Sequence, residues 1–383
     1  MSKRTTCNIE YSERQRALFL AFDLGELKWQ LGFTVGLGQK ARRRTIEGGD
    51  TEALKEEIAA AKKRFGLPGD APVKSCYEAG RDGFWLHRYL VSVGIDNIVV
   101  DSSSIEVNRR KRRAKTDKLD VETLLSMLVR FHYGEHKIWS VVRVPSVEEE
   151  DRRQTHRELR TLKKEKTRTT NRIKGLLASQ GIRLEGRMDL RGKRLEEMRL
   201  WDGEPLPAAL KGRLEREWQH VLFLKKQIDD LETLRKNLLE EGKEPGIEKI
   251  QQLTKLQGIG IESSWVLVRE LFGWRHFRNR RQVGSLIGLT PSPFNSGKTV
   301  REQGISKAGI THVRAVSIEL GWSWLRHQRE SKLTRWYQER FADAGPRARK
   351  VGIVALARRL IIELWRFLEY GVLPEGAQLK AAV

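Results

Sequence analysis

Hydrophobic and polar residues alternate in several short runs over the first part of the chain, and stretches with helical spacing separate these runs. Strands are predicted at ALFLAFDLG (17–25), WQLGFTVG (29–36), ARRRTIE (41–47), VKSCYEAG (73–80) and DNIVVD (96–101). Helices are predicted at TEALKEEIAAAKKRFG (51–66) and DGFWLHRYLVSVG (82–94). A basic loop and a further helix follow the last strand. This alternation of strands and helices predicts an α/β domain over residues 17–146.

The middle of the chain has a different pattern. Residues 147–179 and 211–241 are highly charged, contain almost no Pro or Gly, and carry Leu at helical spacing. They predict two long helices that form an antiparallel pair or a coiled coil, serving either as a spacer or as a dimerisation surface. The segment 181–210 between them has weaker periodicity and is interpreted as an insert or flexible tip.

The chain becomes helical again from about residue 248, and a Gly-, Pro- and Ser-rich stretch (288–309) interrupts it. Further helices are predicted at 310–327 and 347–370. The predicted division is a basic tail (1–16), the α/β domain (17–146), a helical linker (147–247), a mainly helical domain (248–330) and a helical extension (331–383).

The charge of the chain points to its class of partner. Lys and Arg number 73 against 50 Asp and Glu, which gives a net charge of +23 and a pI near 10.1. Basic residues recur along the whole chain, and such a field attracts nucleic acid first and anionic membranes second. No apolar run approaches the ~18 residues of a membrane span, and the N-terminus lacks the apolar core of a signal peptide. A cytoplasmic, nucleic-acid-associated protein is expected.

Cysteine and histidine do not form a recognisable metal motif. Cys7 and Cys76 make neither a disulfide framework nor a zinc-ligand set, and the eight histidines lack paired-ligand spacing. A bound metal would therefore be held by oxygen, which favours Mg²⁺ or Mn²⁺.

Four acidic residues follow the predicted elements in a suggestive order. Asp23 lies on the first strand, Glu78 ends the fourth, and Asp117 and Asp120 lie on one face of the next helix. Four carboxylates near the carboxyl ends of adjacent strands would repel one another unless cations lay between them. Two Mg²⁺ about 4 Å apart would neutralise them and can bind the attacking and leaving oxygens of a phosphodiester. A run of basic residues before the helix would hold the nucleic-acid backbone. It consists of Arg109, Arg110, Lys111, Arg112, Arg113 and Lys115. The alternative is ordinary helix capping, with Thr116 as N-cap and acidic residues in the first turn.

The order of these motifs and the residues in them resemble those of a known protein family. The D…E…D-x-x-D series is similar to the RuvC-type, RNase H-like nuclease core. FDLG (22–25), YEAG (77–80) and AKTDKLDVETL (114–124) resemble the DEDD transposases of bacterial insertion sequences. These transposases are related to the Piv DNA invertase, and they are recombinases guided by a bridge RNA. The resemblance implies an RNase H-like N-terminal domain and a recombinase that uses metal ions.

The same resemblance covers a serine segment. GLTPSPFNSGKTVREQGISKAG (288–309) matches the family's serine stretch and implies that Ser296 is the nucleophile, with Ser292 as the main rival. It also implies nucleic-acid contacts by Lys298, Lys307 and Arg314. Ile310 and Val313 depart from the family's usual residues, which leaves fine specificity or local packing open. From the residues alone, roles in turns and caps are favoured for Ser292, Ser296 and Ser306, which lie among Gly and Pro.

Two further features have a structural and a functional interpretation. LQGIGIESSWVLV (256–268) resembles a helix-hairpin-helix, in which Gly258 and Gly260 would let the backbone approach a phosphate, whereas a simple helix–helix turn is the alternative. Tryptophans also lie among basic residues in the C-terminal half, where they could stack on unpaired bases. Their helical spacing favours the core instead. They are Trp274, Trp322, Trp324, Trp336 and Trp365.

Together with this resemblance, the sequence predicts a transposase or site-specific DNA recombinase that uses Mg²⁺ or Mn²⁺, two ions being expected. The resemblance also implies a serine–DNA intermediate and a guide RNA. A homo-oligomer, a dimer or tetramer with active sites shared between subunits, and an association with the nucleoid are expected. The alternatives are a RuvC-like junction nuclease that uses water and a non-catalytic basic nucleic-acid-binding protein.

Overall fold

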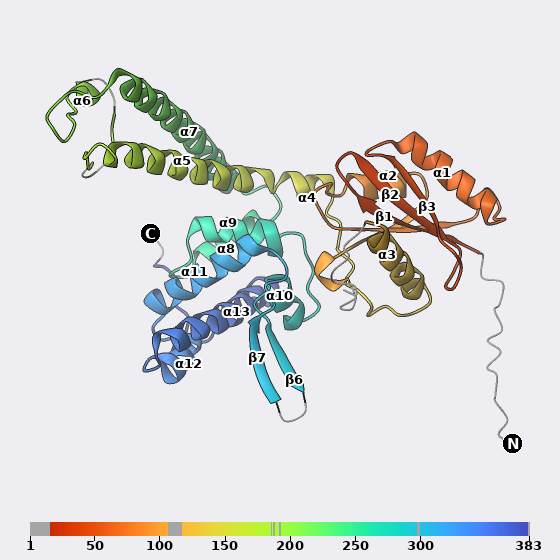
Figure 1. Cartoon of the computed structure of the whole chain (residues 1–383). Helices are drawn as coiled ribbons and strands as arrows, with labels where there is room; N and C mark the ends of the chain where they lie inside the picture. Colours follow the sequence, from red (N-terminus) through yellow and green to blue (C-terminus); the bar gives the residue numbers. More distant parts are fainter. Residues whose placement is uncertain are drawn as a thin grey trace. The chain divides into compact units, whose positions relative to one another are not determined.

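The computed structural model describes residues 16–105, 117–184, 186, 188–190, 193–296 and 299–381. Contacts between residues divide the chain between Pro145 and Ser146 into an N-terminal unit and a C-terminal unit (Figure 1). Each unit is described separately. No helix in the described ranges combines the length and the apolar character needed to cross a bilayer.

The N-terminal unit is built on a five-stranded mixed sheet with the order β3-β2-β1-β4-β5. Its strands are β1 (Leu18–Leu24), β2 (Lys28–Thr34), β3 (Arg42–Glu47), β4 (Val73–Glu78) and β5 (Asp96–Val100). The first three strands pair antiparallel, whereas β4 and β5 run parallel to β1. The predicted strands, and the mixed α/β class, are confirmed.

Helices cover both faces of this sheet because its central strands are apolar on both sides. Helix α1 (Thr51–Arg64) and helix α2 (Trp85–Ser92) pack on one face, where Leu54 and Leu86 join Leu20 in one core cluster. Helix α3 (Asp117–His132) packs on the other face through Val121, Leu124 and neighbouring apolar residues. Strand β1 is consequently buried along Leu18–Phe22. The predicted helix after the basic loop is confirmed, and its placement fixes which face carries the acidic residues.

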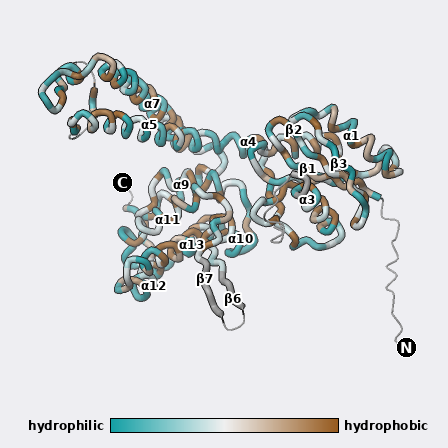
Figure 2. The backbone as a smooth tube through the Cα atoms, in the orientation of Figure 1, coloured by the Kyte–Doolittle hydropathy of each residue, from teal (hydrophilic) through white to brown (hydrophobic). Residues whose placement is uncertain are grey.

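The C-terminal unit begins with two long helices that pack side by side, as Figure 1 shows. After the short helix α4 (Val147–Asp151) come α5 (Gln154–Ala178) and α7 (Ala208–Glu241). Ion pairs join Arg172 to Glu217 and Lys163 to Glu232, so residue numbers rise on one helix as they fall on the other. The antiparallel pair is confirmed. Hydrophilic and hydrophobic residues interleave along both helices (Figure 2), as the sequence pattern indicated.

The segment between these helices is packed against them. It contains helix α6 (Lys193–Glu196) and a backbone bridge between Arg199 and Pro205. Leu190, Leu195 and Leu206 are buried in one cluster with residues of both long helices, including Ile173 and Trp218. The described part of this segment is therefore a small folded cap on the helix pair, and its weak periodicity reflects its short elements.

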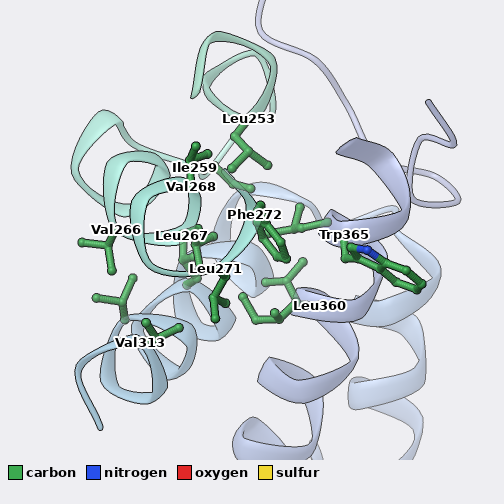
Figure 3. Close-up of a cluster of buried hydrophobic side chains, with 14 of the residues drawn as sticks. Leu253, Ile259, Val266, Leu267, Val268, Leu271, Phe272, Val313, Leu360 and Trp365 are labelled. Carbon is green, nitrogen blue, oxygen red and sulfur yellow. The ribbon is translucent and has the colours of Figure 1, made fainter. Parts of the chain in front are cut away.

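The rest of the C-terminal unit is a helical body around one hydrophobic core (Figure 3). It comprises α8 (Ile247–Thr254), α9 (Ile261–Leu267), a π-helical turn (Val268–Phe272), α10 (Arg280–Leu286), α11 (Thr311–His327), α12 (Lys332–Phe341) and α13 (Pro346–Tyr370). Figure 3 shows Leu360 and Trp365 of α13 beside Phe272 and Leu271. The tail beyond residue 331 therefore completes the core of this body.

The predicted helices near 310–327 and 347–370 are confirmed as α11 and α13. The preference for core tryptophans also holds for most of the five. Trp274, Trp324 and Trp365 are buried. Trp336 is half-buried, while Trp322 is 47% exposed.

The Gly-, Pro- and Ser-rich stretch forms a β-hairpin, which the sequence pattern did not predict. Strand β6 (Pro291–Ser296) pairs antiparallel with β7 (Thr299–Ile305), with an irregularity in register between Pro291 and Pro293. Proline cannot donate a backbone hydrogen bond and therefore argues against a central strand. In a two-stranded ribbon both strands are edges, so proline is tolerated there, and the turn-like composition concealed the strands.

Candidate functional site

Two of the predicted acidic residues lie at the same level of neighbouring parallel strands. Phe22 of β1 is in register with Tyr77 of β4, so the next residues, Asp23 and Glu78, lie side by side. Alternation along the strands places both on the face that carries Ala21 and Cys76, which is the face covered by α3. Asp23 is half-buried and Glu78 is exposed. The paired strands therefore present two carboxylates at one edge of the sheet.

Helix α3 runs antiparallel to β1 across this face. Near its C-terminal end, the ring of His132 lies 5.9 Å from the ring of Phe19, at the start of β1. Nearer its N-terminal end, Val121 contacts Gly32 so closely that a Cβ at Gly32 would overlap the valine side chain. Gly32 pairs with Ala21 across the strands. The first turn of α3 consequently lies toward the carboxyl ends of β1 and β4.

The backbone therefore places the four acidic positions that the sequence singled out toward the same end of the sheet. Asp117 and Asp120 occupy the first turn of α3, and the side chain of Asp120 is exposed. The side chain of Asp117 lies outside what the structure describes, as do residues 109–113 and Lys115. Among the described residues, no group of three or more His, Cys, Asp or Glu is arranged to hold a metal.

Asp101 is a carboxylate at the same sheet edge that sequence reasoning did not weigh. It follows directly after β5, and the signal for it was the final residue of DNIVVD. Glu78 is in register with Val100, so alternation turns Asp101 to the opposite face of the sheet. Its carboxylate accepts hydrogen bonds from the backbone N–H and the hydroxyl of Ser103, at 2.9 and 2.8 Å. Asp101 therefore caps the 3₁₀ turn Ser102–Ser104.

The candidate nucleophile belongs to the other unit. Ser296 is the last residue of β6 and pairs with Thr299 of β7, so it lies at the far end of the hairpin from the helical body. The side chain of Ser296 and the residue Lys298 lie outside what the structure describes. Ser292 lies near the opposite end of β6 and is half-buried. The two rival serines are thus separated along one strand.

The foot of this hairpin is tightly constructed. Lys307 adopts φ +56°, and it is the single non-glycine residue with positive φ in the described ranges. The guanidinium of Arg314 donates to the Lys307 carbonyl at 2.9 Å and to the Thr311 hydroxyl at 3.2 Å. Gly288 and Gly309 have positive φ and lie so close to backbone carbonyls that a Cβ would overlap them. Arg314, predicted to bind nucleic acid, also braces the hairpin foot from within.

The glycines of the helix-hairpin-helix-like segment also have internal partners. The Gly258 carbonyl accepts a hydrogen bond from the Ser323 hydroxyl at 2.7 Å. A Cβ at Gly258 would lie 3.0 Å from His327 Cβ. The close approach made possible by Gly258 is therefore to α11. Gly260 is the N-cap residue of α9, and the space around its Cβ position is open. A phosphate contact at these glycines stays a prediction.

A buried ionic cluster, which no sequence motif indicated, joins α5 to the π-helical turn. The Glu270 side chain is 5% exposed and accepts two hydrogen bonds from Arg157, at 2.7 and 2.8 Å. His156 Nε2 lies 2.9 Å from the same carboxylate. Burial opposes ionisation of Glu270, yet the hydrogen bonds from His156 and Arg157 outweigh it and hold its pKa well below the usual range.

The protonation of His156 follows from this geometry. Burial lowers the pKa of His156, although the hydrogen bond to Glu270 acts in the opposite direction. A neutral imidazole with its proton on Nε2 avoids burying a second charge and still donates a hydrogen bond from Nε2 to the Glu270 carboxylate. The cluster therefore fixes the long helix pair to the helical body through one carboxylate, and its donors come from residues more than 100 positions away in sequence.

The chain is similar to known transposases. Residues 250–336 match the family model described as Transposase IS116/IS110/IS902 family. Over 378 residues, covering 95% of both chains, it is 39% identical to a Sinorhizobium fredii protein that carries the name transposase y4rJ. It is 26% identical over 183 residues to the transposase for insertion sequence element IS1328 of Yersinia enterocolitica, covering 47% of this chain and 52% of that one. The similarity to the Sinorhizobium fredii transposase spans nearly the whole of both proteins. The chain therefore belongs to the IS116/IS110/IS902 family of insertion-sequence transposases.

Proposed function

We propose that this transposase cuts and rejoins DNA through a covalent link between Ser296 and a DNA phosphate, assisted by divalent metal ions at Asp23, Glu78, Asp117 and Asp120. The observation that supports the proposal is the placement of the acidic positions toward one end of the sheet. Asp23 and Glu78 lie side by side at the ends of β1 and β4, and α3 brings its first turn toward the same edge. The order of strands and helices that positions them supports an RNase H-like, RuvC-type fold for the N-terminal unit.

The residues present are suited to a hard cation. The donors are carboxylate oxygens, and Glu78 and Asp120 are exposed rather than committed to the apolar core. Mg²⁺ or Mn²⁺, as one ion or two, would be held by these carboxylates and would supply charge neutralisation at the phosphate being attacked.

Serine chemistry suits the task of rejoining strands. The Ser296 hydroxyl attacks the phosphorus and loses its proton, while the bond from phosphorus to a deoxyribose oxygen breaks and that oxygen is protonated. A phosphoserine ester remains. A deoxyribose hydroxyl from another strand then attacks this ester, which restores a phosphodiester and frees the serine. Phosphodiester bond energy is conserved through both steps, so no external energy source is required.

The resemblance to bridge-RNA-guided relatives extends the proposal to partners. A structured guide RNA and DNA both suit a chain with a net charge of +23. The antiparallel pair of α5 and α7 offers a long charged surface for self-association. We infer an oligomer in which Ser296 of one subunit serves the acidic cluster of another. Mixing Asp23→Ala protein with Ser296→Ala protein should then restore activity in mixed oligomers.

The decisive experiment traps the covalent intermediate. Wild-type protein incubated with end-labelled element DNA and Mg²⁺ should yield a protein–DNA adduct that survives denaturing electrophoresis. The adduct should disappear in Ser296→Ala and persist in Ser292→Ala. Free cleaved ends without an adduct would instead indicate a RuvC-like nuclease that uses water. Binding without any cleavage, under conditions in which the element is mobile in cells, would favour a non-catalytic nucleic-acid-binding protein.

A further inference from the structure

A second candidate surface lies on the helical body at the foot of the hairpin. A groove of about 660 Å³ runs between α10 and α13. Its lining includes Thr290, the residue that precedes β6, and Leu333 of α12. The Thr290 carbonyl accepts a hydrogen bond from the Ser306 N–H at 2.8 Å, which ties the wall of the groove to both strands of the hairpin at its foot.

The charge of this groove is strongly one-sided. Its lining contains five arginines and one acidic residue, Glu363. Glu363 is engaged by Arg366, whose Nη1 lies 2.9 Å from the carboxylate. The remaining arginines form no ion pair in the described part of the chain. They are Arg280, Arg281, Arg358 and Arg359. A groove that gathers unneutralised guanidinium groups attracts a polyanion.

Two of these arginines, Arg358 and Arg359, make packing contacts. The side-chain stem of Arg358 lies 3.7 Å from the Cβ position at Gly284, so α10 approaches α13 closely there. The guanidinium of Arg359 lies over the Trp336 ring, 4.0 Å from its centroid. Burial lowers the pKa of Arg359, and the charges of Arg358 and Arg340 lower it further. The groove thus keeps four arginines together, and the carboxylate in its lining, Glu363, is already paired with Arg366.

We propose that this groove binds the phosphodiester backbone of a nucleic-acid strand and leads it to the hairpin that carries Ser296. Guanidinium forks match phosphate oxygens geometrically, and a row of them suits a polymer of phosphates better than one isolated phosphate. The position at the hairpin foot favours nucleic acid over an acidic protein. That part of the argument rests on the proposed function of the hairpin, whereas binding itself is testable without any cleavage.

The first test removes the charge and retains the shape. Arg280→Gln/Arg281→Gln/Arg358→Gln protein is compared with wild type for binding of duplex DNA, single-stranded DNA and structured RNA over a range of salt concentrations. Each lost phosphate contact lowers the slope of log K against log salt by about 0.7 to 0.9, so the triple variant should lower it by about 2 to 3. Arg280→Lys/Arg281→Lys/Arg358→Lys should restore most of the slope.

A matched control separates the groove from the general charge of the protein. Arg326→Gln/Arg329→Gln/Arg347→Gln removes the same charge from exposed arginines elsewhere on the helical body. Its salt slope should stay close to that of wild type. Equal reductions in the two triple variants would overturn the proposal, because the groove would then act only through net charge. Poly-glutamate serves as a probe for binding of an acidic protein. A groove variant that lost binding of poly-glutamate but kept all nucleic-acid binding would also overturn the proposal.

The second test identifies the ligand in place. Ser285 lines the groove and is exposed. A photoactivatable group on Ser285→Cys, in a Cys7→Ser background, can report on the bound strand, because Cys76 is buried and its burial raises the pKa of its thiol. Crosslinks to DNA or to RNA identify which strand occupies the groove. Arg329→Cys serves as the control position, and crosslinking from the groove position that is no stronger than from this control would contradict the assignment. Both tests read binding alone, so failure of the serine chemistry would leave their result interpretable.

Discussion

The two candidate catalytic regions are positioned by different kinds of structure. In the N-terminal unit, Asp23 and Glu78 are placed by backbone pairing between adjacent strands of a sheet that is buried on both faces. In the C-terminal unit, Ser296 ends one strand of a two-stranded ribbon, and the tight contacts lie at the opposite end of that ribbon. The core of the sheet therefore fixes the positions of Asp23 and Glu78 directly. The position of Ser296 is fixed indirectly, by the contacts at the foot of the hairpin.

This difference suits different tasks. Metal ligands require a geometry that is fixed before the substrate arrives, and a sheet core provides it. In the proposed function, the serine at the end of the hairpin is attached to the helical body through the other end of the ribbon. The charged cluster around Glu270 and the basic groove both lie in the C-terminal unit. Sequence motifs indicated neither of these two groups of charged side chains.

The largest expected effect follows from removing a carboxylate at the sheet edge. Glu78→Gln should lower DNA cleavage by about 10³-fold, because a lost metal ligand removes several kcal/mol of transition-state stabilisation. Since Glu78 is exposed, the melting temperature should change little. Chelation of divalent ions should have the same effect on cleavage. Glu26→Gln, which alters an exposed carboxylate paired with Arg81, is the control and should stay active.

The next effect concerns the buried cluster of the C-terminal unit. Glu270→Gln should lower the free energy of unfolding of this unit by about 3 kcal/mol at pH 7, because it breaks a buried ion pair. The folded-state pKa of Glu270 lies below the ordinary value of 4.5, so its contribution is present above pH 4.5 and is lost as the pH falls below it. Denaturant unfolding at pH 7 and at about pH 3.5 measures this.

The control for that measurement is an exposed ion pair between α5 and α7. Glu232→Gln removes a partner of Lys163 whose side chain is 46% exposed, and should cost no more than about 1 kcal/mol. A difference between wild type and Glu270→Gln that stayed constant from pH 7 to about pH 3.5 would contradict the assigned direction of the Glu270 pKa shift.

The hairpin foot offers a matched pair of glycines. Gly304 and Gly309 both have φ +86°, but a Cβ at Gly309 would overlap the Leu286 carbonyl whereas the space at Gly304 is open. Gly304→Ala should cost about 1 kcal/mol from backbone conformation alone. Gly309→Ala should cost about 2 kcal/mol or more, because overlap is added. The free energy of unfolding and the yield of serine–DNA adduct measure both substitutions. Equal costs at the two positions would show that the foot is loosely packed.

The smallest effect tests how α3 is seated on the sheet. Gly32→Ala should cost about 1 kcal/mol or more in free energy of unfolding, because the added methyl group overlaps Val121. Val121→Ala leaves room for that methyl group, so the double variant should be more stable than the sum of the single variants by about 1 kcal/mol. A double-mutant cycle measured by chemical denaturation reports this coupling. Simple additivity would mean that α3 shifts freely on the sheet.

The sequence alone determined the order of elements in the N-terminal unit, because hydrophobic periods of two and of 3.6 residues are local properties. It also determined the long helix pair, whose charge and Leu spacing persist over many turns. The four acidic positions were found in the same way, since a strand end or a first helical turn can be recognised from its neighbours. Their convergence required the register of Phe22 with Tyr77 and the direction of α3.

Only the tertiary structure decided the features built from distant residues. The β6–β7 hairpin was concealed by prolines that a two-stranded ribbon tolerates. The Glu270 cluster joins residues 114 and 113 positions apart. The arginine groove combines α10 with α13, which meet only because both pack on one core. Local sequence records which residues are apolar or charged, but the pairing of surfaces depends on how whole elements share a core, and that information becomes visible only when the chain has folded.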